Sequence, residues 1–257
     1  YKVLHGIIDS LWVKRKDSFV SANKLSRMIS NKTGIRMDVE GHYKWIVFLP
    51  SKNTGVGALN RYYGVFDSGE IKVRGVELRQ KNSPVFLKEM QKEIIMLFSK
   101  AKNKSEFLAL IQDALEIVYK YAKKIIKGEV LQKNIIISSC VSRDISEYKV
   151  NNHVKSALLN LRKEGVEVKP GQTVRYVVRD EKNKVHMKRV CILEKLKEND
   201  KIDVDFYLRL ISQYTESLLV PFGFTLEKIY EILMKIKIRE RYNVSVLPGI
   251  RTCQTSL

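Results

Sequence analysis

The chain has 257 residues, 44% of them hydrophobic and 29% charged, a balance typical of one or two folded domains and unlike that of disordered or fibrous proteins. Lysine and arginine number 47 against 28 acidic residues, and the net charge of +19 favours polyanionic partners, either nucleic acid or an anionic membrane surface. No apolar run approaches the roughly 20 residues of a membrane span, and the three scattered cysteines argue against disulfides and structural zinc.

The first third of the chain has the composition of a small antiparallel β unit with one helix. Residues 1–13 are apolar and β-prone and begin without a leading cap or turn, so we expect a partner segment N-terminal to them. A helix is predicted over 22–33, with its apolar residues on one side and Gly34 as its stop. β-branched and aromatic runs predict strands over 35–50, 62–66 and 70–78.

The periodicity becomes helical after Pro84, which we take as the boundary between domains over 1–84 and 85–257. Helices are predicted over 86–98 and 105–127, the second ending at Gly128. The elements predicted beyond them are a strand over 130–141, a helix over 150–164, a strand over 172–179, and two helices capped by Asp203 and Thr225. The last fifteen residues lack periodicity and are expected to fray.

Four lysines crowd the last turns of the predicted helix over 105–127, namely Lys120, Lys123, Lys124 and Lys127. They lie where the helix dipole is negative, so a solvated C-terminal turn explains them as well as a contact to nucleic acid does. Both interpretations stay open at the level of sequence.

Residues 5–10 read His-Gly-Ile-Ile-Asp-Ser, which taken alone is an apolar strand with one carboxylate at a turn. Together with the apolar residues on either side, the segment resembles the β-turn-β unit of a polymerase palm, where family B DNA polymerases carry Tyr-Gly-Asp-Thr-Asp-Ser. Gly6, Asp9 and Ser10 match that motif.

The resemblance continues in order along nearly the whole chain. Residues 43–52 look like the palm strand that follows in archaeal family B polymerases, and residues 59–64 are similar to their Lys-Lys-Arg-Tyr-Ala-Gly motif. Residues 73–79 and 82–84 resemble the segment that leads from palm to thumb. Matches to the thumb signature and its closing helices lie at 147–155, 165, 170–172, 214, 216–217 and 221–224.

The resemblance implies an α+β fold, in which 1–84 form the C-terminal part of an antiparallel β palm and 85–257 a mainly helical thumb with a frayed tail. It also implies a DNA-directed DNA polymerase, a nucleotidyltransferase that works by two-metal chemistry only when an N-terminal portion supplies the rest of the palm and the fingers. The alternative is a catalytically inactive DNA-binding or scaffolding subunit of a replication or repair assembly.

The implied partners are primer–template duplex DNA, the N-terminal polymerase portion, and a sliding clamp or other replication proteins. No membrane partner is expected, because neither tryptophan falls in a predicted helix with a charged opposite face. The location implied by these partners is cytoplasmic and nucleoid-associated.

By resemblance, Asp9 is the retained second aspartate of the turn motif, a catalytic residue and a ligand for Mg²⁺ or Mn²⁺. The first aspartate position is Ile7, which offers no oxygen to a hard cation, so this chain alone is expected to bind metal weakly if at all. Glu40 resembles a palm glutamate near the metals and is the second predicted ligand, with an ordinary surface carboxylate as the alternative.

The motif near the primer end has lost both lysines, which appear here as Leu59 and Asn60. Asn60, Arg61 and Tyr62 are the predicted DNA-binding positions in this motif, through phosphate contact and sugar packing. The changes at Ile7, Leu59 and Asn60 are similar to those of archaeal family B paralogues with degraded catalytic motifs. Further phosphate contacts, each with an ordinary exposed side chain as the alternative, are predicted at Arg79, Lys81, Tyr148, Lys149, Asn151 and Lys155.

Overall fold

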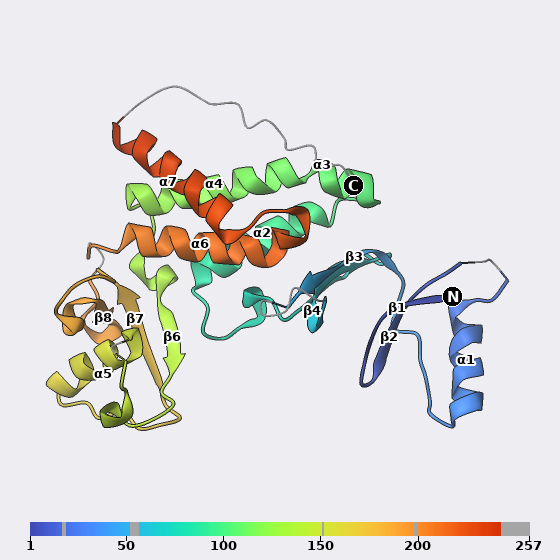
Figure 1. The fold of residues 1–257 in the computed structure, drawn as a ribbon, viewed down its shortest axis with the longest axis horizontal. Helices are drawn as coiled ribbons and strands as arrows, with labels where there is room; N and C mark the ends of the chain where they lie inside the picture. Colours follow the sequence, from blue (N-terminus) through green and yellow to red (C-terminus); the bar gives the residue numbers. More distant parts are fainter. Residues whose placement is uncertain (17–18, 52–56, 151, 198–199, 243–257) are drawn as a thin grey trace.

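The computed structural model describes residues 1–16, 19–51, 57–150, 152–197 and 200–242. These residues form antiparallel sheets and a layer of helices, so the predicted α+β fold class is confirmed. Figure 1 shows the longer helices gathered in one layer, with one three-stranded sheet beneath each end of that layer. The N-terminal hairpin and the first helix lie farthest from the C-terminal sheet.

The N-terminal hairpin packs on the first sheet through aromatic rings. The hairpin and the sheet consist of β1 (Lys2–Ile7) paired with β2 (Ser10–Lys14), and of β3 (Tyr43–Pro50), β4 (Gly57–Phe66) and β5 (Ile71–Arg74) in that order. The ring of Trp12 lies 5.2 Å from that of Tyr62 and 6.0 Å from that of Phe48. The ring of His5 lies 4.7 Å from that of Phe48. These contacts fix the direction in which the hairpin turn points.

Two of the predicted strands are shorter in the structure than the sequence indicates. The prediction of a strand from residue 35 is wrong, because β3 begins only at Tyr43 and residues 35–42 are irregular. The strand predicted over 70–78 ends at Arg74, because Gly75 adopts a positive φ of 63°. A Cβ at Gly75 would lie 2.3 Å from the Asn60 carbonyl oxygen, so a close backbone approach requires glycine here.

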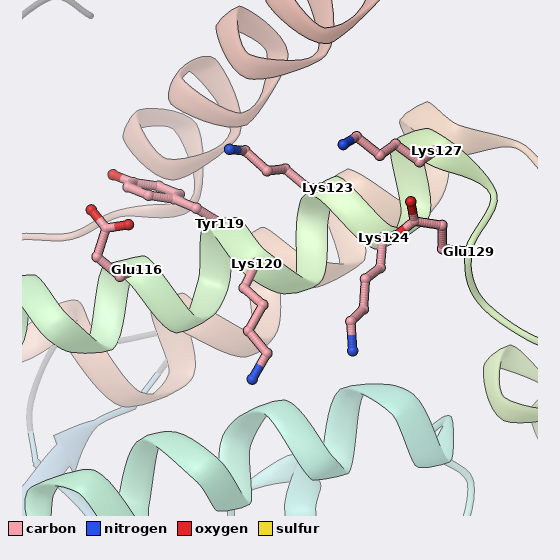
Figure 2. A pocket seen from close by; sticks show the side chains of 7 residues that line it. All are labelled: Glu116, Tyr119, Lys120, Lys123, Lys124, Lys127 and Glu129. Carbon is pink, nitrogen blue, oxygen red and sulfur yellow. The ribbon is translucent and has the colours of Figure 1, made fainter.

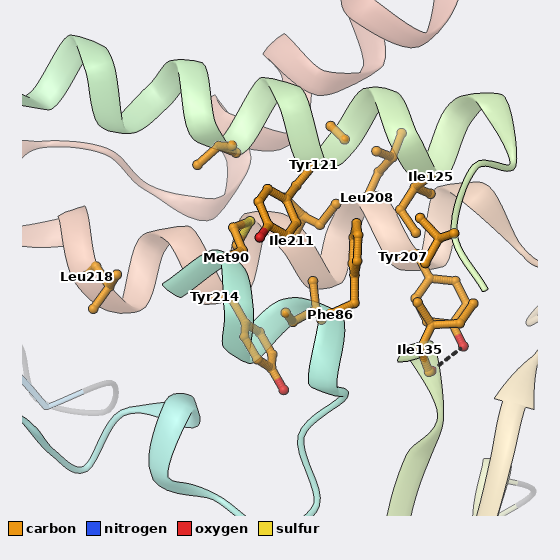
Figure 3. Close-up of a cluster of buried hydrophobic side chains, with 14 of the residues drawn as sticks. Phe86, Met90, Tyr121, Ile125, Ile135, Tyr207, Leu208, Ile211, Tyr214 and Leu218 are labelled. Carbon is orange, nitrogen blue, oxygen red and sulfur yellow. Dashed lines mark hydrogen bonds between the residues drawn. The ribbon is translucent and has the colours of Figure 1, made fainter. Parts of the chain in front are cut away.

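The helical layer contains most of the hydrophobic core (Figure 3). Its members are α2 (Val85–Phe98), α3 (Lys104–Ala109), α4 (Ile111–Lys127), α6 (Val204–Leu219) and α7 (Leu226–Tyr242). Tyr207 of α6 is fully buried, and its hydroxyl donates to the carbonyl of Ile135 at 3.1 Å and accepts from the amide of Val178 at 3.1 Å. One side chain therefore ties the helical layer to the C-terminal sheet.

The single helix predicted over 105–127 is wrong, because the chain forms two helices that meet at Leu110. The backbone of Leu110 has φ −79° and ψ −4°, a tight turn that α-helical geometry does not contain. The apolar spacing continues across this turn, so periodicity alone does not reveal it. The predicted stop at Gly128 is confirmed, with φ 70° and its amide bonded to the carbonyls of Ile125 and Lys124.

The C-terminal sheet packs against one short helix. Its elements are β6 (Ile137–Cys140), β7 (Thr173–Val178), β8 (Val190–Ile192) and α5 (His153–Lys163). The prediction of a strand from residue 130 is wrong at its N-terminal end, since residues 132–135 form a 3₁₀ turn before β6. The predicted helix and second strand are confirmed within three residues at each boundary.

The first helix, α1 (Ala22–Thr33), has the predicted bounds and ends at Gly34 with φ 72°. It buries none of its side chains. The predicted cap Asp203 accepts from the amide of Phe206, which starts α6 as expected. The predicted fraying of 243–257 lies outside the described residues. Among the helices of the described residues, none combines the length and the apolar character needed to cross a bilayer.

Candidate nucleic-acid interface

The hairpin turn between β1 and β2 carries Asp9. Ile7 pairs with Ser10 across the hairpin, so Ile8 and Asp9 form the two-residue turn and both are exposed. The hydroxyl of Ser10 donates to Asp9 Oδ1 at 3.2 Å. Ile7 stands at the first aspartate position of the turn motif and is half-buried. The turn therefore presents a single carboxylate, that of Asp9.

Glu40, the second predicted metal ligand, forms an ion pair with Lys72 of β5. Burial, and then the nearby Arg74, lowers the pKa of Lys72. Asp9 and Glu40 are therefore held by different partners. Within the described ranges, no three or more His, Cys, Asp and Glu side chains gather where they could hold a metal ion.

Strand β4 carries the residues predicted to contact a primer end. Asn60 is exposed, but Tyr62 is buried in the aromatic contacts with Trp12 and Phe48. The guanidinium of Arg61 donates to the carbonyl of Pro50 at 3.0 Å and to that of Gly75 at 3.2 Å. The side chain of Leu59 lies outside the described residues. Arg61 thus has a structural role, which leaves part of its donor set for other partners.

The segment that leaves the first sheet is joined to the helical layer by a buried polar network. Glu77 is 9% exposed, and its two carboxyl oxygens accept from Ser217 Oγ at 2.7 Å and from Gln91 Nε2 at 3.0 Å. Gln91 also donates to the carbonyl of Tyr214 at 2.8 Å and accepts from the amide of Leu78 at 2.8 Å. Sequence reasoning did not find this network, because its members are as much as 140 residues apart.

Arg79 and Lys81 follow this network directly, and both are exposed. Three residues after Arg79 the chain approaches the C-terminal sheet, where the amide of Ser138 in β6 donates to the carbonyl of Asn82 at 3.3 Å. The two predicted phosphate ligands therefore lie beside a junction of the first sheet, the helical layer and β6. A rigid base of this kind lets long basic side chains reach a phosphate backbone.

The predicted positions at 148–155 are divided between structural and exposed roles. Tyr148 is buried, its hydroxyl accepts from the amide of Ser142 at 3.3 Å, and the guanidinium of Arg143 lies 5.7 Å from its ring centre. Lys155 donates to the carbonyl of Tyr148 at 2.8 Å. Lys149 is exposed. The prediction at Asn151 lies outside the described residues.

Comparison with known proteins agrees with this architecture. The sequence profile of DNA polymerase family B matches residues 2–222. The chain belongs to DNA polymerase family B. It is 29% identical over 238 residues to DNA polymerase 1 of Sulfurisphaera ohwakuensis, a match that covers 90% of this chain and 25% of that protein.

Two further matches place the family resemblance among archaea. The chain is 26% identical over 232 residues to DNA polymerase 1 of Saccharolobus solfataricus, covering 88% of this chain and 24% of that protein. The structure of the family B DNA polymerase from Pyrobaculum calidifontis has the same fold, with a TM-score of 0.59, 22% identity, and coverage of 98% of this chain and 27% of that chain. The chain thus spans about a quarter of the length of these relatives.

The metal chemistry implied for the family needs several oxygen ligands around each divalent ion. In this chain the turn offers Asp9 alone, Ile7 supplies no oxygen, and Glu40 is paired with Lys72. The oxygen ligands that the described residues offer around Asp9 are too few to hold two metal ions. Any such site that includes Asp9 requires carboxylates from outside the described residues.

Proposed function

We propose that the chain is the palm and thumb portion of a family B DNA-directed DNA polymerase, with residues 1–84 as palm and 85–257 as thumb. Its own task is to hold primer–template duplex DNA without reading the base sequence. The junction at Arg79, Lys81 and β6 is the observation that carries this proposal. There, the exposed side chains of Arg79 and Lys81 follow a backbone segment that the Glu77 and Gln91 hydrogen bonds hold against the helical layer.

Binding of this kind rests on phosphate contacts. Arg79, Lys81 and Lys149 are exposed and able to pair with phosphates, while Lys155 and Tyr148 support the loop that carries Lys149. The chain's charge of +19 adds long-range attraction to DNA. Such contacts position a protein on duplex DNA and give little discrimination between bases.

Nucleotidyl transfer on this proposal needs an N-terminal portion with the remaining palm, the fingers and further carboxylates. Asp9 would be this chain's contribution to a Mg²⁺ or Mn²⁺ site shared with that portion. The turn is well placed for such a role, because it is exposed and its direction is fixed by the aromatic contacts of His5 and Trp12.

Primer extension tests the catalytic part of the proposal. The chain would be mixed with an N-terminal family B portion and Mg²⁺ or Mn²⁺, as wild type, as Asp9→Ala and as Asp67→Ala. Asp67 is a matched control, because it is an exposed aspartate in the turn between β4 and β5. Extension should be abolished by Asp9→Ala and unaffected by Asp67→Ala.

A second candidate function is a non-catalytic DNA-binding or scaffolding subunit. It is favoured by the isoleucine at position 7 and by the pairing of Glu40 with Lys72, since both reduce the donors available for a metal. Duplex binding by all three proteins, without extension by any of them, would support this candidate and refute the polymerase role.

A further inference from the structure

The charged surface along the C-terminal half of α4 is balanced within the chain. Figure 2 shows lysines and glutamates together along this surface. Lys120 Nζ lies 2.8 Å from Glu93 of α2, and Lys123 and Lys127 lie 3.6 and 3.4 Å from Glu240 of α7. Carboxylates therefore offset the positive charge here.

The hairpin of β1 and β2, in contrast, presents an apolar surface to water. His5 and Trp12 pair across the hairpin, and both of their rings contact the first sheet. Side chains alternate between the two faces of a strand, so Leu11 and Val13 lie on the opposite, outer face. Val3 joins them, because it pairs with Val13. Val3 is 58% exposed and Leu11 48%.

An antiparallel sheet that keeps one face in water normally carries polar side chains on that face. Apolar residues on both faces are typical of strands that are covered on both sides. Helix α1 lies beside the hairpin in Figure 1 but leaves Val3 and Leu11 exposed. In the described part of the chain no third strand joins β1 and β2, so their outer edges are open, and edges of this kind are usually protected. The hairpin therefore has the character of an element that another polypeptide surface covers.

We propose that this outer face docks the N-terminal polymerase portion. The inference rests on the proposed function, because it names the surface through which that portion would join the chain. Two observations favour this occupant. The chain spans about a quarter of the length of its archaeal relatives. The apolar surface also reaches the hairpin turn, since Leu11 lies two residues after Asp9 and Ile8 is fully exposed. A portion seated there would lie next to Asp9, as a shared metal site requires.

A second copy of the chain is a less favourable occupant. The net charge of +19 makes two copies repel each other. At the open end of the hairpin, Lys2 and Lys14 pair across the strands and both are exposed, an arrangement in which like charges are unfavourable. A partner with carboxylates beside its apolar face would relieve this repulsion, whereas a second copy brings the same lysines. The expected partner surface is therefore apolar with acidic side chains at one side.

The test measures association by isothermal titration calorimetry. The full chain is titrated with the N-terminal portion of an archaeal relative, ending where its match to this chain begins. The wild type is compared with the double variant Val3→Glu and Leu11→Glu and with a control, Leu131→Glu and Val185→Glu. The control is matched, because Leu131 and Val185 are 49% and 52% exposed and lie before β6 and β8, away from the hairpin.

The hairpin double variant should weaken association roughly a hundredfold, because it would bury two carboxylates in an apolar contact. The control should match the wild type. Urea denaturation shows whether each protein still folds. The milder Leu11→Ser keeps the ring contacts of Trp12 on the inner face and should weaken association roughly tenfold, so the test does not depend on the double variant.

Association that is unchanged in both hairpin variants would overturn the proposal, as would equal losses in the hairpin and control double variants. A dimer of the chain alone in sedimentation velocity, abolished by the hairpin double variant, would assign the face to a second copy instead. Duplex binding, measured in parallel, separates this inference from the proposed function. Duplex binding without association would refute the docking face alone. Association that the hairpin variants weaken, without duplex binding by any protein, would support the docking face and refute the DNA-holding role.

Discussion

The junction between the first sheet and the helical layer should depend strongly on one buried amide, that of Gln91. The residue is fully buried and makes three hydrogen bonds, to Leu78 N, Glu77 Oε2 and the Tyr214 carbonyl oxygen. Gln91→Leu keeps the approximate volume but leaves all three groups without this partner. At about 1–3 kcal/mol for each buried group left unpaired, and with partial relaxation, the free energy of unfolding should fall by about 3–5 kcal/mol.

Such a loss is a large fraction of the roughly 5–15 kcal/mol that stabilises a typical domain. Urea denaturation followed by circular dichroism measures it. Gln112→Leu is the matched control, since it makes the same chemical change on the exposed face of α4 and should shift stability by about 0.5 kcal/mol or less. A loss below about 1 kcal/mol for Gln91→Leu would refute the inference that this network fixes the junction.

Two further predictions concern the C-terminal sheet. Tyr207→Phe removes the hydroxyl that bonds to Ile135 and Val178 and should destabilise the chain by about 2 kcal/mol in the same denaturation assay; an unchanged midpoint would contradict it. Burial lowers the pKa of His153 from its ordinary 6.5. Below pH 6.5 this imidazole is therefore protonated more readily in the unfolded chain than in the folded one. Stability should therefore fall as the pH is lowered from 7 to 5, and His153→Gln should reduce that dependence; an equal dependence in both proteins would exclude this source.

Local sequence signals predicted those parts of the fold that depend on short-range chemistry. Gly34 and Gly128 end helices because each residue adopts a positive φ, and Asp203 starts one by accepting from a backbone amide. These are interactions between residues a few positions apart, so the sequence contains them directly.

The break at Leu110 shows what local signals cannot contain. Phe107, just before it, packs against Phe98, Trp45 and Phe222, with ring centres 4.2, 4.8 and 5.2 Å away. Two of these partners come from distant segments. The continuous apolar spacing therefore predicted one helix, whereas the chain forms two helices whose junction lies beside these tertiary contacts.

The sequence indicated which positions belong to the candidate interface. It did not indicate which of those side chains are exposed and which make contacts within the chain. The order of motifs led to Arg61, Tyr148 and Lys155, yet the structure engages each of them in contacts within the chain. Nothing in the sequence indicated that Lys72 pairs with Glu40. Partners of long side chains depend on backbone placement across strands, which a single sequence read by itself does not supply.

The most direct test of the account is titration of a labelled primer–template duplex with the 257-residue chain at 50 and 200 mM salt. With the three exposed basic side chains Arg79, Lys81 and Lys149 each neutralising one phosphate, affinity should fall roughly fortyfold over this range and should be the same for duplexes of different sequence. The double change of Arg79 and Lys81 to Gln should make the slope of log K against log salt less negative by about 2, whereas Lys100 and Lys102 to Gln should not. Equal binding by both double variants, or no duplex binding at 50 mM salt, would contradict the claim that this junction holds DNA.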